Sequence, residues 1–172
     1  FFDLLPMRFK TDSGFDLKIK LFTVPGQVIH QSTRRIVLQG ADAVVFVADS
    51  QIEQSSQNKF SFSDLRDNLV ANDLAKDLPL VIQFNKQDMQ NVRTRQEIEA
   101  FGARVNSPVF LATAIEGTGV VETLRGLLEL CWSQLDAKYN FGERLGLSQK
   151  SFLTGLFEDW QQPTDELARL SW

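Results

Sequence analysis

The sequence predicts an α/β fold built on a mixed, mostly parallel sheet, and three observations carry this prediction. Two apolar runs, 43–48 and 78–82, lack the polar alternation of a half-exposed strand, as expected for strands buried on both faces of a sheet. Segments with the apolar spacing of helices separate such runs along the chain. Polar loops directly follow three strand-like runs, and loops of this kind meet at one edge of an open parallel sheet.

The individual elements follow from the same patterns. The first two strands alternate polar and apolar residues, and Thr11-Asp12-Ser13-Gly14 is a hairpin turn between them. The predicted strands cover residues 4–9, 15–22, 43–48, 79–84 and 108–112. The predicted helices cover residues 29–38, 58–72, 94–104 and 119–136.

Composition narrows the class of protein. The 172 residues are 43% hydrophobic, which is enough for one sizeable core. The net charge of -4 gives no basic surface for nucleic acid. No apolar run reaches the ~18 residues of a membrane span. Cys131 is the single cysteine, so no internal disulfide can form, which favours a reducing cytoplasm.

The four residues Asn85-Lys86-Gln87-Asp88 directly follow the apolar run 78–84 and have the chemistry to read a guanine. The aspartate can accept hydrogen bonds from both guanine donors, N1–H and N2–H, while the asparagine amide meets the other edge of the purine. Adenine lacks this donor pair. The loop therefore predicts selectivity for guanine over adenine.

Two further loops lie where a nucleotide-binding α/β domain would place them. Thr23-Val24-Pro25-Gly26-Gln27 ends the alternating run 15–22, and Ala112-Thr113-Ala114 ends the run 109–111. Each loop taken alone is an ordinary turn about as often as a site. All three in this order favour a nucleotide site, because the carboxyl ends of parallel strands share one crevice.

In these loops the chain resembles the small Ras-like GTPases, and within them the bacterial MglA-type polarity and gliding GTPases. The resemblance also includes Phe1-Phe2-Asp3 with Pro6, and the segments 40–50 and 116–124, so it covers roughly residues 1–135. It implies the three-layer P-loop NTPase fold of a Ras-like G domain. It also implies a GTP/GDP switch with slow GTP hydrolysis, acting in bacterial cell polarity or motility.

The resemblance assigns roles to single residues. Gln27 would orient the water that attacks GTP. Lys86 would pack its stem along the base, and Ala114 would offer its backbone N–H to the guanine carbonyl oxygen. The nucleotide-binding set implied is Asn85, Lys86, Asp88, Ala114 and Gly26, and the second switch loop implied is Thr23, Pro25, Gly26 and Gln27.

Mg²⁺ is expected as a cofactor together with GTP or GDP, but one ligand differs from the common pattern. Most small GTPases have an aspartate that holds Mg²⁺ through water where this chain, like MglA, has Thr23. A neutral hydroxyl binds a hard cation more weakly than a carboxylate does. No other residue of this chain is a firm metal candidate.

The phosphate-binding pattern G-x-x-x-x-G-K-S/T does not occur among the ten glycines of the sequence. We expect the first strand and the phosphate loop to precede Phe1, so that GTPase activity, and Mg²⁺ binding with it, belong to the complete protein rather than to this chain alone. One alternative is a non-catalytic module that keeps the G-domain shape without phosphate binding. Another is a guanine-reading protein of the ADP-ribosylation-factor type.

The resemblance stops near Tyr139, which predicts a partial G domain at 1–138 and a linker with an amphipathic helical extension at 139–172. Residues 140–146 have the composition of a linker, and 148–160 has a helical apolar stripe. The stripe consists of Phe152, Leu153, Leu156, Phe157 and Trp160. Either it folds back on the domain, the favoured interpretation, or it is a docking element.

The expected partners are a guanine nucleotide, a GTPase-activating protein of the MglB/roadblock type and effector proteins. Two other features suit several roles. Arg34 and Arg35 are typical of a solvated helix face rather than of catalytic arginines, and His30 is as suited to a partner contact as to catalysis. Asp49 and Ser50, which end a buried strand, fit a structural turn and a site contribution equally well.

Overall fold

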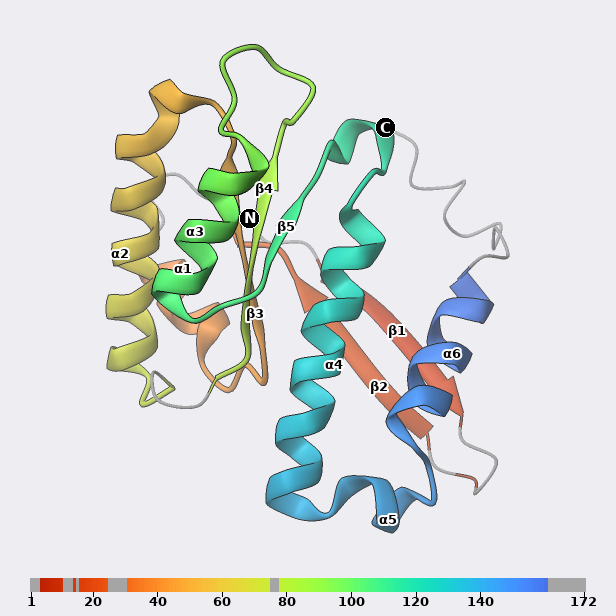
Figure 1. Ribbon diagram of the computed structural model, residues 1–172. Helices are drawn as coiled ribbons and strands as arrows, with labels where there is room; N and C mark the ends of the chain where they lie inside the picture. The colour runs from red at the N-terminus through yellow and green to blue at the C-terminus, as the bar shows by residue number, and fades with distance from the viewer. Residues whose placement is uncertain (1–3, 11–13, 15, 25–30, 75–77, 161–172) are drawn as a thin grey trace. The chain divides into compact units, whose positions relative to one another are not determined.

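The computed structural model describes residues 4–10, 14, 16–24, 31–74 and 78–160 (Figure 1). The chain forms two compact units. One contains the described parts of Val24–Cys131, and the other contains those of Asp3–Thr23 and Trp132–Trp172. The predicted division into 1–138 and 139–172 follows the resemblance rather than compactness, and it stays a prediction.

The first unit is built on a three-stranded parallel sheet in the order β3-β4-β5 (Figure 1). Its strands are β3 (Val44–Asp49), β4 (Leu80–Asn85) and β5 (Val109–Leu111). Asp49 lies opposite Asn85, and Phe84 lies opposite Leu111. The three strands therefore end at the same edge of the sheet, which confirms the parallel arrangement that the apolar runs predicted.

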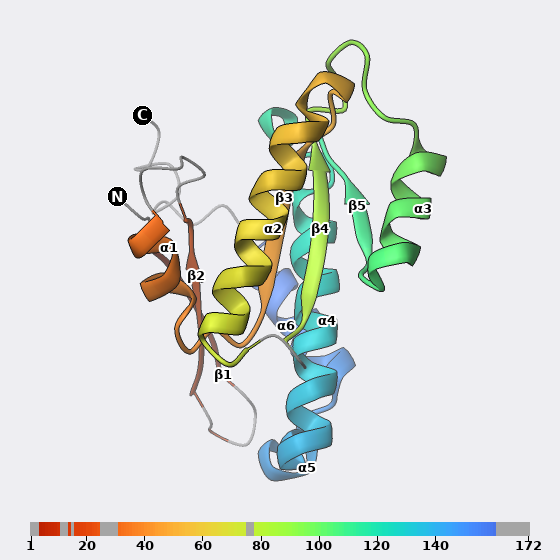
Figure 2. The ribbon, with the colours of Figure 1, turned by 90° about the vertical axis from the view of Figure 1, so that its left-hand side faces the viewer.

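Helices cover both faces of this sheet, giving three layers (Figures 1 and 2). The helices that contribute to the unit are α1 (Gln31–Leu38), α2 (Ser55–Ala71), α3 (Arg95–Val105) and the first part of α4 (Val120–Tyr139). Ile82 and Phe84 of β4 pack with Ile98 of α3 and Phe62 of α2. Gln83, which points to the opposite face, contacts Thr123 of α4. The predicted α/β class is confirmed.

Gln83 is a polar residue in the middle of an apolar strand, and the structure explains it. Its side chain is 6% exposed, and its Nε2 donates a hydrogen bond to Thr123 Oγ1 at 2.9 Å. Thr123 Oγ1 in turn donates to the Gly119 carbonyl at 2.6 Å. Since a buried amide without a partner costs about 1–3 kcal/mol, this chain of bonds fixes the start of α4 against β4.

Arg34 differs from the prediction of a solvated helix face. Its Nε lies 2.9 Å from Asp64 Oδ2 of α2, and the two side chains are only 13% and 11% exposed. The prediction was wrong because helix α2 covers this side of α1 and supplies a buried counter-charge. Arg35 remains exposed and donates to the Ala71 carbonyl at 3.3 Å.

The second unit is built on an antiparallel hairpin of β1 (Leu4–Lys10) and β2 (Asp16–Phe22). Exposed and half-buried residues alternate along both strands, as the sequence predicted. The hairpin forms its own two-stranded sheet and does not pair with β3 through any described residue. The antiparallel pairing therefore lies in this hairpin, and the parallel pairing lies in the sheet of the first unit.

Helix α6 (Gln149–Trp160) buries its apolar stripe within the second unit. Four of its side chains are buried, with 4% to 8% of each exposed: Phe152, Leu153, Leu156 and Phe157. Phe152 meets Phe9 of β1 edge-to-face, with ring centroids 5.9 Å apart, and stacks on Trp132 at 4.8 Å. The stripe is thus covered by this chain itself, in agreement with the interpretation that it folds back. The side chain of Trp160 lies outside the described residues.

Residues 140–146 were predicted to be a linker, and that prediction was wrong, because they contain the short helix α5 (Phe141–Leu145). Asn140 and Gly146 bound the helix in left-handed conformations, with φ of 52° and 61°. Between them Phe141 packs on Trp132 with centroids 5.0 Å apart, and Leu145 is buried. The packing of Phe141 and Leu145 stabilises a helix in a segment whose glycine and polar residues are typical of a linker.

Candidate functional site

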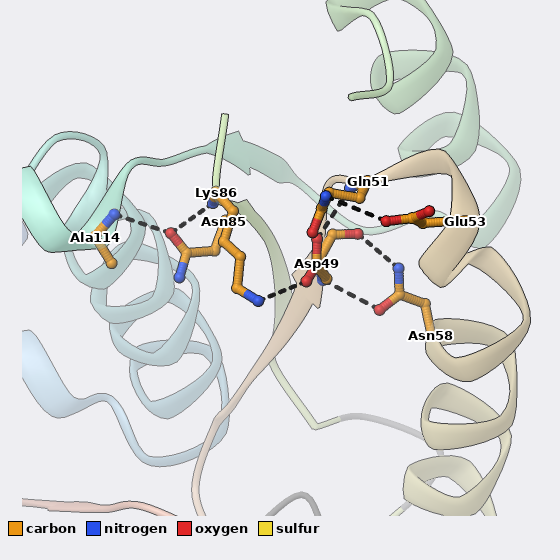
Figure 3. A network of polar contacts seen from close by, with 7 residues as sticks. All are labelled: Asp49, Gln51, Glu53, Asn58, Asn85, Lys86 and Ala114. Atoms are coloured by element: carbon orange, nitrogen blue, oxygen red, sulfur yellow. Dashed lines mark hydrogen bonds and ion pairs between the residues drawn. The ribbon is translucent and has the colours of Figure 1, made fainter. Parts of the chain in front are cut away.

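The candidate site lies at the edge of the first unit's sheet where β3, β4 and β5 end (Figure 3). β3 ends at Asp49, and β4 ends at Asn85, the first residue of the predicted guanine loop. β5 leads into the loop 112–119, which contains a short 3-10 turn, η3 (Ala114–Glu116). Two of the three loops predicted from the sequence are therefore brought together.

Asn85 joins these two loops. Its Oδ1 accepts hydrogen bonds from the backbone N–H of Lys86, at 2.8 Å, and of Ala114, at 2.9 Å (Figure 3). Because two N–H groups converge on this atom, it must be the amide oxygen. No described residue takes the hydrogens of the Asn85 Nδ2, so they stay available for an acceptor such as a purine ring nitrogen.

Ala114 was expected to offer its N–H to the guanine carbonyl oxygen. In the structure this N–H is donated to Asn85, which sequence reasoning did not foresee. The two atoms are 29 residues apart in the chain, so no local pattern could reveal the bond. The role of Ala114 toward guanine stays a prediction that requires this bond to be shared or exchanged.

The loop 112–119 owes its path to two glycines with φ of 77°, a left-handed conformation that favours glycine. A Cβ at Gly119 would overlap the Leu111 carbonyl oxygen and lie 2.8 Å from the Ala112 Cα. At Gly117 a Cβ would meet nothing within 4 Å. Thr113 donates its N–H to the Thr118 carbonyl at 3.0 Å and closes the loop. The position of Ala114 is thus fixed by backbone geometry.

Lys86 adopts an unusual backbone conformation, with φ of 66°. Its ammonium Nζ lies 2.7 Å from Asp49 Oδ2, and the side chains of Lys86 and Asp49 are 53% and 18% exposed. The sequence left open whether Asp49 belongs to a turn or to the site. The structure places it beside the guanine loop.

Asp49 is itself held on several sides. Its Oδ1 accepts the Gln51 N–H at 3.0 Å. The side chain of Asn58 in α2 brackets its backbone, because Asn58 Nδ2 donates to the Asp49 carbonyl at 2.7 Å and Asn58 Oδ1 accepts the Asp49 N–H at 3.1 Å (Figure 3). Sequence reasoning missed Asn58, since a lone asparagine on a helix carries no signal of such a role.

Ser50 and Gln87 form a second contact between the same two strand ends. Ser50 is fully buried, and its Oγ accepts a hydrogen bond from Gln87 Nε2 at 2.6 Å. The Ser50 N–H donates to the Asn85 carbonyl at 2.9 Å, and the Gln87 N–H donates to the Ala112 carbonyl at 3.1 Å. The guanine loop is therefore fastened to β3 and to the loop that follows β5.

Asp88 is exposed at the end of this fastened loop. No hydrogen bond or ion pair ties its carboxylate to any part of the chain that the structure describes, so both oxygens can accept from a ligand. The arrangement can present a carboxylate acceptor and an amide donor. That combination suits a base with two adjacent donors on one edge and an acceptor nitrogen on another.

The third loop falls mostly outside the described residues. Pro25, Gly26 and Gln27 lie there, as does His30, while Thr23 is described and exposed. Within the described ranges no group of three or more histidine, cysteine, aspartate or glutamate side chains could hold a metal ion. In the same ranges no helix is both long and apolar enough to cross a membrane.

Comparison with known proteins identifies the class. The sequence model of the ADP-ribosylation factor family matches residues 9–131, which is most of the chain. The chain therefore belongs to the small Ras-like GTPases, a family whose members in general bind guanine nucleotides and Mg²⁺.

A curated relative places the chain more closely within that family. The mutual gliding-motility protein MglA of Myxococcus xanthus (strain DK1622) is 42% identical over 137 residues, which cover 78% of this chain and 70% of MglA. The resemblance to MglA-type small GTPases is confirmed, as is the P-loop GTPase fold class.

Proposed function

We propose that this protein is a GTP/GDP switch that hydrolyses GTP slowly and acts in bacterial gliding motility or cell polarity. The observation that carries the proposal is the anchoring of Asn85 between two loops, which leaves its Nδ2 and the Asp88 carboxylate available together at the strand ends. The relationship to a mutual gliding-motility protein supports the cellular role.

Base reading follows from these two side chains. Asp88 accepts N1–H and N2–H of guanine, and Asn85 Nδ2 donates to a ring nitrogen on the other edge. With adenine, Asp88 would face no such donor pair, and an unpaired carboxylate costs several kilocalories per mole once it is desolvated. Guanine nucleotides are therefore preferred.

Hydrolysis is assigned to the segment Thr23 to Gln27 by the family pattern. Gln27 orients the attacking water, and Pro25 and Gly26 belong to the same switch loop with Gly26 contacting nucleotide. If Mg²⁺ binds here, the Thr23 hydroxyl would be the residue of this loop that holds it, more weakly than a carboxylate would. The GTP-loaded state has ordered switch loops, and conversion to GDP releases effectors.

The partners follow from a switch of this kind. GTP loading recruits effectors, and a GTPase-activating protein of the MglB/roadblock type accelerates the slow hydrolysis. We place the protein in the cytoplasm, where its one thiol stays reduced. Helix α6 is assigned to the stability of the second unit, because its apolar stripe is buried there.

The direct test is nucleotide selectivity in the full-length protein. We expect GDP and GTP to bind far more tightly than ATP. Asp88→Asn should weaken GDP binding about a hundredfold and favour xanthosine diphosphate, whose 2-oxo group accepts a hydrogen bond from the new amide. Asp67→Asn, which removes an exposed carboxylate of α2, is the matched control and should change neither affinity. Equal affinities for ATP and GTP in the wild type would refute guanine reading.

A second measurement addresses turnover. Gln27→Leu should reduce single-turnover GTP hydrolysis and leave the affinity for GTP within a few fold, since the lost interaction exists in the transition state. Unchanged hydrolysis would remove Gln27 from the mechanism. GTP binding without any hydrolysis in the wild type would favour a non-catalytic interaction module.

A further inference from the structure

We propose that Asp49 is a positioning residue of the guanine site, which orders Lys86 and the loop behind it before any nucleotide arrives. The inference rests on the proposed function, because it deepens the account of the same loop. Its central observation is the 2.7 Å ion pair between Asp49 Oδ2 and Lys86 Nζ, which joins the end of β3 to the guanine loop.

The Asp49 carboxylate is held in place by other groups, while the side chain of Lys86 is not. Asp49 is 18% exposed, and its other carboxylate oxygen accepts the Gln51 N–H. The amide of Asn58 bonds both its N–H and its carbonyl. Lys86 is 53% exposed and carries a long flexible stem. The rigid partner therefore orients the flexible one, and not the reverse.

The backbone of Lys86 also depends on its surroundings. A non-glycine residue with φ of 66° lies in the left-handed region, which its surroundings must maintain. Three contacts meet this need from separate directions. Asn85 Oδ1 accepts the Lys86 N–H, Asp49 holds the ammonium, and Ser50 Oγ accepts the Gln87 side chain. Two of the three come from consecutive residues at the end of β3.

Asp88 depends on this arrangement. Asp88 follows Lys86 and Gln87 directly, and its own side chain is exposed. The turn that carries it begins at Lys86, because the Met89 N–H donates to the Lys86 carbonyl at 3.1 Å. If the Lys86 end of the loop loosens, Asp88 samples more orientations, and binding a base must first restore order at a cost in affinity.

A pure charge effect and a positioning role predict opposite changes in GDP affinity when Asp49 is replaced by Asn, so one measurement separates them. Asp49→Asn removes a negative charge and frees the Lys86 ammonium. If charge alone mattered, a polyphosphate anion would then bind more tightly. If Asp49 positions the loop, GDP should bind more weakly, by about tenfold given the partial exposure of the pair.

The experiment measures GDP dissociation constants in the full-length protein for the wild type, Asp49→Asn, Lys86→Gln and the double variant. Asp42→Asn is the matched control, since Asp42 is exposed just before the opposite end of β3 and its substitution removes the same charge. We expect Asp49→Asn to raise the GDP dissociation constant about tenfold, Asp42→Asn to leave it unchanged, and Asp49→Asn to change it less than about twofold when Lys86 is already replaced. A merely structural role of Asp49 would weaken binding equally in both backgrounds.

A second measurement separates this inference from the proposed function. Hydrogen exchange of the Lys86 and Gln87 amides, without nucleotide, should become faster in Asp49→Asn than in Asp42→Asn. If the wild type failed to bind GDP, the proposed function would fall, and faster exchange would still support the positioning role. Three results would each overturn the positioning role of Asp49. They are unchanged amide exchange in Asp49→Asn, tighter GDP binding by Asp49→Asn, and a loss of GDP affinity that persists when Lys86 is already replaced by Gln.

Discussion

The two sheets of this protein are stabilised in different ways. The parallel sheet β3-β4-β5 has helices on both faces, and Val81 and Ile82 in its central strand are fully buried. The two described strands of the hairpin, β1 and β2, have no fully buried residue, and every second side chain along them is exposed. The loops proposed to read the base follow the strands of the parallel sheet. A site that has to hold an asparagine and an aspartate in fixed directions is best placed where the backbone has least freedom.

Replacing one isoleucine in each sheet compares the stability of the two sheets directly, and it gives the largest change that we expect. Ile82→Ala should lower the free energy of unfolding by about 2–5 kcal/mol, because it leaves a cavity beside Phe84 and Ile98. Ile19→Ala, in the half-buried face of β2, should cost about 1 kcal/mol. Urea unfolding followed by circular dichroism measures both. Equal losses would mean that the hairpin is packed as firmly as the parallel sheet.

A second comparison tests how strictly backbone geometry holds the loop that carries Ala114. Gly117→Ala should cost about 1 kcal/mol, from its left-handed conformation alone. Gly119→Ala should cost about 3 kcal/mol, since its methyl group would also collide with Leu111 and Ala112. Thermal unfolding in parallel gives the difference. If the two variants lost the same stability, the close approach at Gly119 would be relieved by movement of β5.

The smallest effect compares helix starts in the two units. Thr94 Oγ1 accepts the Glu97 N–H while Glu97 accepts the Thr94 N–H, a reciprocal capping box at α3. At α6, Ser148 Oγ accepts the Ser151 N–H. Thr94→Ala should cost about 1 kcal/mol, and Ser148→Ala about half of that. Urea unfolding distinguishes them, and a larger loss in Ser148→Ala would contradict the ranking.

The same cap predicts a dependence on pH. The Thr94 N–H and then its hydroxyl hold the pKa of Glu97 below its ordinary value of 4.5. A lowered folded-state pKa stabilises the fold above 4.5, and this contribution is lost as the pH falls through the lowered value. Thr94→Ala removes the hydroxyl, so its stability should fall less than that of the wild type over this window. An identical fall in both proteins would show that the hydroxyl does not contribute.

The single thiol offers a chemical check on the first unit. Burial, and after it the negative charge of Asp42, raises the pKa of Cys131 to about 11. The thiol is therefore protonated at neutral pH and should react slowly with iodoacetamide at pH 8. Reaction as fast as that of a free cysteine would show that this end of α4 opens readily.

Local sequence patterns predicted the strands, the helices and the chemistry of the proposed base-reading loop. Alternation identified the hairpin, continuous apolar runs identified the buried parallel strands, and Asn85 with Asp88 predicted a guanine ligand. These signals are local, since each depends on residues within a few positions of one another. They failed at 140–146, where two apolar side chains made a helix out of a segment with the composition of a linker.

The way in which the loop is held depends on contacts between distant parts of the chain. The bonds that hold it join residues 37 positions apart, from Asp49 to Lys86, and 29 positions apart, from Asn85 to Ala114. The role of Asp49 stayed open in the sequence, and the bond between Asn85 and Ala114 carried no local signal, because the bonded residues lie far apart in the chain. Parallel strands bring their carboxyl ends to one edge, and at that edge distant side chains become neighbours. The residues proposed to read the base are therefore neighbours in the sequence, while the contacts that hold their loop depend on packing.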